Sequence, residues 1–324
     1  MNYSLGIDTS CYTTSVAILN ELGQLVADCR RILRVKNGGR GLQQSEMVFQ
    51  HTRNMPELFA EACCNFPRPV SFKTIAVSAF PRPLPDSYMP AFLVGEGYAK
   101  VLALTHNVPL YRISHQENHI LAGIWSAGGP KSANFLAVHL SGGTTEIVKV
   151  SADANKADSS RLSTEIIGRS QDIHAGQLID RIGVLLGLSF PAGPQLEALA
   201  ALYRDQAVKI PVSIREATVS FTGPETHVRK LIAQGTDRGA IAAGVELCIS
   251  KAVTAMINHA VINTGLTEVL LVGGVMANRF IRNYLLEHLE HTGVARLYFP
   301  DNIYSPDNAT GAAYFALNAG QTPL

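Results

Sequence analysis

Two stretches of the chain repeat one pattern, and this repeat constrains the fold more than any other feature. They read LGIDTSCYTTSVAI from Leu5 and LAVHLSGGTTEIVK from Leu136. Each contains an apolar strand, a short turn with a serine, a Thr-Thr pair and a second strand of alternating character. Because the two hairpins lie far apart in one chain, we predict a duplicated α/β domain with a cleft between its copies.

The seam AGGPKSA at 127–133 is rich in turn-forming residues and directly precedes the second hairpin. We therefore predict an N-terminal lobe over 1–126 and a C-terminal lobe over 127–307, with a helix at about 308–320 that joins the first lobe. A chain of 324 residues that is 47% hydrophobic is long enough to bury a core in each lobe.

Several stretches of the second lobe have a clear period. Helical patterns dominate 172–204 and 240–265, and the latter ends on a glycine suited to cap a helix. The stretch EVLLVGGVMANRFIRNYLLEHL at 268–289 predicts an apolar strand, a Gly-Gly turn and a helix. The polar segment SADANKADSS at 151–160 is expected to be a loop between strands.

The composition excludes some classes of protein. Lys and Arg number 27 against 26 Asp and Glu, so the whole chain offers no strongly basic field for nucleic acid. Five cysteines without a Cys-x-x-Cys pair fit a reduced compartment better than a disulfide framework. The start MNYSLGIDTS has no signal-peptide pattern, and no apolar run approaches the roughly 18 residues of a membrane helix. We expect a cytoplasmic protein with no membrane partner.

The turn of the second hairpin is a candidate phosphate site. The backbone N–H groups of Ser141, Gly142, Gly143 and Thr144 could face outward, and the glycines permit the close approach that cradling a phosphate demands. A Gly-Gly pair is also common in ordinary hairpin turns. The similar turn within 8–14 and the later GGVMAN favour a nucleotide site.

The predicted helix in DIHAGQLIDRIGVLLGL carries one carboxylate on a stripe of glycines. Gly176, Asp180, Gly183 and Gly187 follow one another at offsets that share a helical face. Glycine in a helix interior costs about 0.5–1 kcal/mol relative to alanine, so a ligand or a backbone is expected to lie close against this face. Asp180 could then bind ribose hydroxyls. The alternative is tight helix packing with a solvated aspartate.

The segment HQENH places two histidines four residues apart, so that they share a helical face and could bind one divalent metal. A zinc protease has the pattern His-Glu-x-x-His, in which the glutamate acts as the base. Gln116 holds that position here, and Glu117 points to another side of the helix. His115 and His119 need a third ligand, for which Asp301 and Asp307 are candidates; they could also be ordinary hydrogen-bonded histidines.

Seven motifs, spread in order over nearly the whole chain, can be read together: GIDTSCYTTSVAI, HQENHILA, LSGGTTEIV, AGQLIDRIGVLLGLSFPAGPQLEALA, SFTGPETHVRKL, GGVMANRFIR and SPDNATGAA. This set resembles the tRNA threonylcarbamoyladenosine transferase family, formerly labelled O-sialoglycoprotein endopeptidases. The resemblance implies the α/β, actin-like and sugar-kinase-like ATPase fold, in which two RNase H-like lobes surround a nucleotide cleft. It also argues against a protease.

The resemblance assigns roles by position. His115, His119 and Asp307 match the family's metal ligands, and the metal, iron or zinc, would hold a carbamoyl adenylate. The adenine nucleotide, as ATP, AMP or that adenylate, would contact a second set: Ser141, Gly142, Gly143, Asp180, Gly193 and Asn278, together with Thr144 of the same turn, which does not match the family. Asp8 is a candidate catalytic residue that could orient a water or the phosphates. The implied partners are tRNA and accessory proteins of the tRNA-modification machinery.

The sequence departs from the family pattern around the acceptor and its activation. Tyr12 and Thr13 stand where the family has Asp and Glu, Thr144 and Glu146 replace His and Gln, and Glu225 replaces Lys. The stretch GGRGLQQSEMVFQH also lacks the family's Gly-Gly-Val-Val-Pro-Glu. This pattern indicates a divergent paralogue.

The leading hypothesis is a metal-dependent (threonyl)carbamoyl transferase that acts on tRNA adenosine. The alternatives are carbamoyl transfer to a different acceptor, or a non-catalytic nucleotide-binding paralogue that regulates or scaffolds another protein. The run RRILRVK at 30–36, with Arg40 nearby, could meet a phosphate backbone, although such charge runs are usually solvated.

Overall fold

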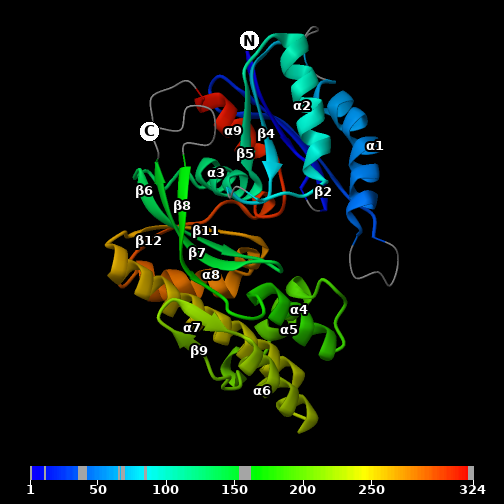
Figure 1. The fold of residues 1–324 in the computed structure, drawn as a ribbon. Coiled ribbons are helices and arrows are strands. Elements are labelled where there is room, and N and C mark those ends of the chain that lie inside the picture. Colours follow the sequence, from blue (N-terminus) through cyan, green and yellow to red (C-terminus); the bar gives the residue numbers. More distant parts are fainter. Residues whose placement is uncertain are drawn as a thin grey trace. The chain divides into compact units, whose positions relative to one another are not determined.

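The computed structural model describes residues 2–10, 12–35, 42–64, 66, 70–83, 86–152 and 162–319. The chain forms two compact units (Figure 1). Unit 1 comprises Met1–Gly129, Ala152–Ser163 and Pro306–Leu324, and unit 2 comprises Pro130–Ser151 and Thr164–Ser305. Each unit is built around its own five-stranded sheet.

The sheet of unit 1 has the order β3-β2-β1-β4-β5. Its first three strands are antiparallel neighbours, and β4 and β5 continue the sheet in parallel with β1. The strands are β1 (Tyr3–Asp8), β2 (Thr13–Asn20), β3 (Leu25–Ile32), β4 (Phe72–Phe80) and β5 (Leu110–Ser114).

Helices cover both faces of this sheet (Figure 1). They are α1 (Gln44–Ala62) and α2 (Phe92–His106) on one face, and α3 (His115–Ala127) and α9 (Thr310–Asn318) on the other. Leu5 and Ile7 of β1 are fully buried against the first pair. Gly6 between them faces α9, where an added Cβ would stand 2.2 Å from the carbonyl oxygen of Ala309, so the close approach of α9 requires glycine.

The sheet of unit 2 repeats this topology, with the order β12-β11-β6-β7-β8. The hairpin β6–β7 is antiparallel, and β11 and β12 run parallel to β6. Asp8 pairs with Ser15 in the first hairpin, and His139 pairs with Glu146 in the second, as the gap-free superposition of the two sequences requires. The predicted duplication is therefore confirmed. The strands are β6 (Asn134–Leu140), β7 (Thr145–Ala152), β8 (Leu162–Arg169), β11 (Glu268–Val272) and β12 (Arg296–Tyr298).

The helices of unit 2 surround one large apolar core. They are α4 (Ala175–Leu185), α5 (Gly193–Ala201), α6 (Thr222–Ala233), α7 (Arg238–Thr264) and α8 (Arg279–Leu285). A separate two-stranded sheet contains β9 (Ser213–Arg215) and β10 (Thr218–Ser220). The short helical turns are η1 (Arg204–Gln206), η2 (Gly274–Ala277), η3 (Leu286–Glu290) and η4 (Asn302–Tyr304).

Helix α7 corrects one expectation from the sequence. Its 27 residues are long and apolar enough to span a membrane by length and composition, although we expected no such run. The helix is the centre of the unit 2 core, because 78% of its most apolar stretch is buried. It ends as predicted at Gly265, whose φ of 71° is the left-handed value that favours glycine. The predicted loop at 151–160 falls mostly on 153–160, outside the described residues.

Candidate functional site

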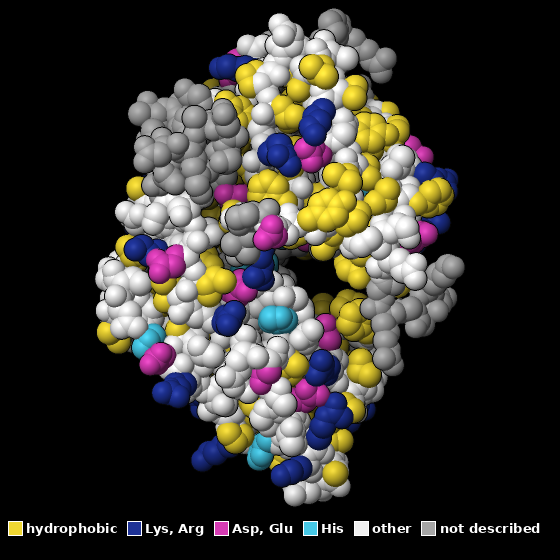
Figure 2. Space-filling model, in the orientation of Figure 1, with side chains coloured by type: hydrophobic (Ala, Val, Ile, Leu, Met, Phe, Trp, Pro, Cys, Tyr) yellow, Lys and Arg dark blue, Asp and Glu magenta, His cyan; other side chains and the backbone are white. Residues whose placement is uncertain are grey.

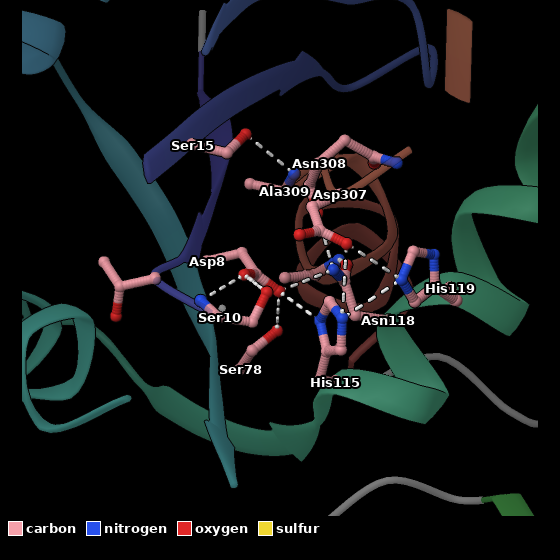
Figure 3. A network of polar contacts seen from close by, with 12 residues as sticks. Asp8, Ser10, Ser15, Ser78, His115, Asn118, His119, Asp307, Asn308 and Ala309 are labelled. Carbon is pink, nitrogen blue, oxygen red and sulfur yellow. Dashed lines mark hydrogen bonds and ion pairs between the residues drawn. The ribbon is translucent and has the colours of Figure 1, made fainter. Parts of the chain in front are cut away.

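The three predicted metal ligands lie together within unit 1 (Figure 3). The Nε2 atoms of His115 and His119 are 3.1 Å apart, and each lies 3.5 Å from Oδ1 of Asp307. A tetrahedral zinc with bonds of roughly 2.0–2.1 Å would separate its ligand atoms by about 3.3 Å. The donor set and its spacing therefore fit one divalent metal. Asp301, the other candidate, does not belong to this cluster.

A capping box starts the helix that carries both histidines. The Ser114 hydroxyl accepts a hydrogen bond from the Glu117 N–H, and the Glu117 carboxylate accepts one from the Ser114 N–H at 2.7 Å. Glu117 is buried in this structural role, so it cannot act as the base of a protease. The Ser-x-x-Glu spacing was visible in the sequence and would have identified this role.

The loop that carries Asp307 is fixed by unit 1 itself. Asn118 donates to the carbonyl oxygen of Asn308 at 2.6 Å and accepts from the N–H of Ala312 at 2.7 Å. Gly311 lies against α3, where an added Cβ would stand 1.9 Å from the Asn118 carbonyl oxygen. Helix α3 and the loop before α9 are therefore held in contact by one side chain and one glycine, which brings Asp307 to the histidines.

Asp8 lies directly behind His115. Its buried carboxylate accepts five hydrogen bonds: one from Nδ1 of His115 at 3.0 Å, one from Nδ2 of Asn118 at 2.9 Å, one from the Ser78 hydroxyl at 2.6 Å, and two from the N–H and hydroxyl of Ser10 (Figure 3). A metal-bound histidine usually donates its second ring nitrogen to such a carboxylate, which fixes the tautomer. Asp8 occupies that position.

The electrostatics of the cluster favour a cation. Burial by itself lowers the pKa of His115, but Asp8 and Asp307 outweigh it and raise this pKa well above its ordinary value. Burial raises the carboxyl pKa values of Asp8 and Asp307, yet their contacts with the imidazoles lower both below the ordinary range. A divalent ion at Nε2 would take the place of the proton that these carboxylates stabilise.

The predicted phosphate turn belongs to unit 2 and is tight. The Ser141 N–H donates to the carbonyl oxygen of Thr144 at 2.8 Å, and the Gly143 N–H donates to the Ser141 hydroxyl at 3.2 Å. These two N–H groups therefore have partners within the turn. Gly142 and Gly143 are exposed, and a Cβ added to either would meet nothing within 4 Å. The turn leaves room for a group such as a phosphate beside both glycines.

The glycine stripe has its explanation within the protein. A Cβ on Gly176 would stand 2.6 Å from the Gly142 nitrogen, and one on Gly183 would stand 2.2 Å from the Cβ of Ala192. Gly176 is therefore required by the close backbone of the turn and Gly183 by the side chain of Ala192, while Gly187 lies beyond the end of α4 with a φ of 78°. Helix α4 is consequently locked against the phosphate turn.

Asp180 on the same helix is half-buried, not solvated. Its Oδ1 accepts a hydrogen bond from the N–H of Ala192 at 2.8 Å, and burial raises the pKa of its carboxyl despite that bond. Its Oδ2 has no hydrogen-bond partner among the described residues. Gly193 begins α5 nearby in the chain, and a Cβ there would also meet nothing within 4 Å.

Asn278 is buried, and its side chain has hydrogen-bond partners that the sequence did not suggest. Its Oδ1 caps α8 through the Ile281 N–H at 2.9 Å, and its Nδ2 donates to Glu246 at 2.5 Å. Glu246 is fully buried and also pairs with Arg204, whose guanidinium stacks 4.0 Å from the Phe280 ring centroid. No pattern in the sequence signals this network, because Glu246 lies in an apolar stretch of α7.

The positions that depart from the family pattern have definite surroundings. Tyr12 is 39% exposed, whereas Thr13 and Glu146 are buried. Glu225 is buried on α6 and pairs with two arginines.

The basic run at 30–36 is partly neutralised, because Arg30 pairs with Asp28 at 2.6 Å and Arg31 pairs with Glu57. Its last residue and Arg40 lie outside the described residues. The two paired arginines have less of their charge available for a phosphate backbone.

Two solved structures resemble the chain in fold. The activator of 2-hydroxyisocaproyl-CoA dehydratase from Clostridium difficile, with bound ADPNP, has a TM-score of 0.53 and 15% identity, over 98% of this chain and 94% of that chain. A ROK family glucokinase from Streptomyces griseus, in complex with glucose and AMPPNP, has a TM-score of 0.54 and 10% identity, over 97% and 99%. These likenesses confirm the predicted actin-like and sugar-kinase-like ATPase fold.

The sequence comparisons identify the family. A family model described as TsaD, tRNA N6-adenosine threonylcarbamoyltransferase, matches residues 49–314. A protein of that description from Aromatoleum aromaticum is 30% identical over 338 residues, which cover 98% of this chain and 94% of the relative. The chain therefore belongs to the tRNA N6-adenosine threonylcarbamoyltransferase family, and it is a transferase, not a protease.

Proposed function

We propose that this protein transfers a threonylcarbamoyl group from an adenylate to an adenosine of tRNA, with one divalent metal and a bound adenine nucleotide. The proposed metal is supported by the convergence of His115, His119 and Asp307, whose ligand atoms all lie within 4.8 Å of one another. Membership of the family supports the reaction. A cytoplasmic location and accessory proteins of the tRNA-modification machinery complete the proposal, on the family resemblance alone.

The reaction is an acyl transfer. The adenosine N6 attacks the carbamoyl carbon, the bond between that carbon and the phosphate oxygen breaks, AMP leaves with the electron pair, and N6 loses one proton. When bound, a divalent metal would supply Lewis-acid polarisation and hold oxygen atoms of the adenylate for attack. Two imidazoles and one carboxylate leave coordination positions open for those oxygens, and such ligands suit iron or zinc.

Residues behind the ligands hold the metal site in shape. The Asp8 carboxylate keeps the proton of neutral His115 on Nδ1, so that Nε2 presents its lone pair to the metal. Ser78 and Asn118 hold Asp8 in turn. Asp8 is thus a positioning residue in this proposal, and the buried hydroxyl and amide contacts replace the water that would otherwise solvate it.

The nucleotide is proposed to bind through unit 2. The space beside Gly142 and Gly143 suits a phosphate, and Oδ2 of Asp180 is available to accept hydrogen bonds from ribose hydroxyls. The open position at Gly193 allows a base to approach the start of α5. Asn278 keeps one amide hydrogen beyond its two protein contacts, and that hydrogen could be shared with the adenine.

The test is complementation in cells that lack their own threonylcarbamoyl transferase but keep the accessory proteins. We expect threonylcarbamoyladenosine in digested tRNA, measured by mass spectrometry, with the wild-type protein but not with the His115→Ala/His119→Ala variant. The matched control is His288→Ala/His291→Ala, which removes two exposed histidines of unit 2 and should behave as wild type. Equal modification by all three proteins would refute the role of the metal ligands, and none by the wild type would refute tRNA as the acceptor.

A further inference from the structure

A buried carboxylate organises two arginines on the surface of unit 2. Glu225 of α6 is 6% exposed and binds Arg181 of α4 at 3.1 Å and Arg229 at 2.6 Å. The two arginine side chains are 48% and 53% exposed, so their remaining N–H groups face solvent. Glu225 therefore holds two guanidinium groups in fixed positions on the surface, which lowers the entropy cost of binding an anion there.

A third arginine lies beside the C-terminal end of α4. Arg238 begins α7 and is exposed, and its Nη2 lies 3.5 Å from the position of a Cβ on Gly187, just beyond α4. The neighbouring Asp237 carboxylate is occupied in capping α7, where it accepts from two backbone N–H groups. With Lys230 on α6, four cationic side chains belong to this part of α4, α6 and the start of α7, and the carboxylates beside them are those of Asp180, Glu225 and Asp237. These seven groups have a net charge of +1, and each of the three carboxylates already accepts a hydrogen bond within unit 2.

An exposed aromatic ring lies in the loop that follows α4, the helix that carries Arg181. Phe190, in the loop between α4 and α5, is 75% exposed. Its loop is anchored on α4, because the Ala192 N–H donates to Asp180 and Ala192 packs against Gly183. Figure 2 shows dark-blue Lys and Arg side chains, with magenta Asp and Glu and yellow hydrophobic side chains among them, over the region where Figure 1 places α4 and α6.

We infer that this surface of unit 2, formed by Phe190, Arg181, Arg229 and Arg238, binds single-stranded RNA of the tRNA substrate. Guanidinium groups bind phosphate oxygens in a planar, bidentate manner, and an exposed aromatic ring stacks on an unpaired base. An acidic protein would need the charges but not the ring. The inference rests on the proposed function, since it names the surface by which the proposed acceptor is held.

The test is binding of a fluorescent, unmodified tRNA transcript, measured by anisotropy at several salt concentrations. Each lost contact between an arginine and a phosphate should reduce the slope of log K against log salt by about 0.7–0.9. We expect a reduction of about 1.5 in the triple variant Arg181→Gln/Glu225→Gln/Arg229→Gln, which leaves no buried charge unpaired. Arg238→Gln should reduce the slope by about 0.8. Phe190→Ala should weaken binding roughly 5- to 150-fold and leave the slope unchanged.

The controls are Lys251→Gln and Ile262→Ala, which remove an exposed charge and an exposed apolar side chain from α7. Both should bind within about twofold of the wild type, since neither side chain belongs to the surface. If all the variants bind as the wild type does while cells still show tRNA modification, the surface is wrong and the proposed function stands. Competition by polyglutamate at the same charge concentration, with no effect of Phe190→Ala, would reassign the surface to an acidic protein. Failure of the wild-type protein to bind tRNA would overturn the inference. The complementation test then decides whether tRNA is still the acceptor.

Discussion

Replacing Gly176 by alanine should destabilise unit 2 and weaken nucleotide binding. The new Cβ would stand 2.6 Å from the Gly142 nitrogen, whereas ordinary contacts begin at 3.4 Å, so α4 and the phosphate turn must separate by about 0.8 Å. That movement would break the 3.1 Å hydrogen bond from the Gly176 N–H to Ser141. Overpacking should lower the free energy of unfolding by about 1–3 kcal/mol, and loss of the hydrogen bond by about 1 kcal/mol more. The higher helix propensity of alanine should raise it by about 0.5–1 kcal/mol. The net loss is about 2 kcal/mol.

Urea denaturation followed by far-UV circular dichroism measures this loss, and isothermal titration with AMP measures the effect on binding. The matched control is Gly97→Ala in the interior of α2, where an added Cβ meets nothing within 4 Å. That substitution should stabilise the protein by about 0.5–1 kcal/mol. A Gly176→Ala protein with the stability and AMP affinity of the wild type would show that α4 is not locked against the turn.

Three further outcomes follow from the structure. Asp8→Asn should weaken metal binding by about 10- to 100-fold in a chelator competition, because Asp8 fixes the orientation of His115. Burial raises the pKa of Asp172, but hydrogen bonds from Ser220 and its neighbours outweigh it and lower that pKa to about 2. The pKa of Asp172 is lower in the folded than in the unfolded protein, so the ionised carboxylate stabilises the fold above about pH 4. Asp172→Asn should therefore lower the free energy of unfolding by about 1 kcal/mol there, after allowance for screening by solvent. The difference between the urea midpoints of the variant and the wild type should narrow as the pH falls toward about 2. Burial raises the pKa of the Cys248 thiol to about 12, so iodoacetamide at pH 8 should label the exposed Cys64 and reach Cys248 only in denaturant, as peptide mass spectrometry can show.

The sequence predicted the elements whose evidence is local or repeated. The two hairpins could be superposed without gaps, and the pairing of Asp8 with Ser15 and of His139 with Glu146 follows that superposition. The end of α7 at Gly265 was also predictable, because a glycine that follows a periodic stretch commonly caps a helix. The close approach at Gly176 was expected from the cost of glycine in a helix, although the backbone that approaches could not be named.

Contacts between distant parts of the chain could not be predicted in this way. Asp8 and His115 come together only because β1 and the start of α3 meet at one edge of the sheet. Glu246 and Asn278 are likewise far apart in the sequence, and the apolar residues around Glu246 in the sequence give no sign of a polar network. The approach of Asp307 to the histidines was available only from the family resemblance, since the residues alone left Asp301 open as well.

The most direct test of the account is the metal content of the purified protein, measured by elemental analysis beside the nucleotide that copurifies with it. We expect one iron or zinc per chain in the wild type and in His288→Ala/His291→Ala, and its loss from His115→Ala/His119→Ala. Each double variant removes two histidines, so a general loss of imidazole groups cannot explain a difference in metal content between them. Protein that takes up no stoichiometric metal when supplied with iron or zinc, or a His115→Ala/His119→Ala variant that retains it, would contradict the account.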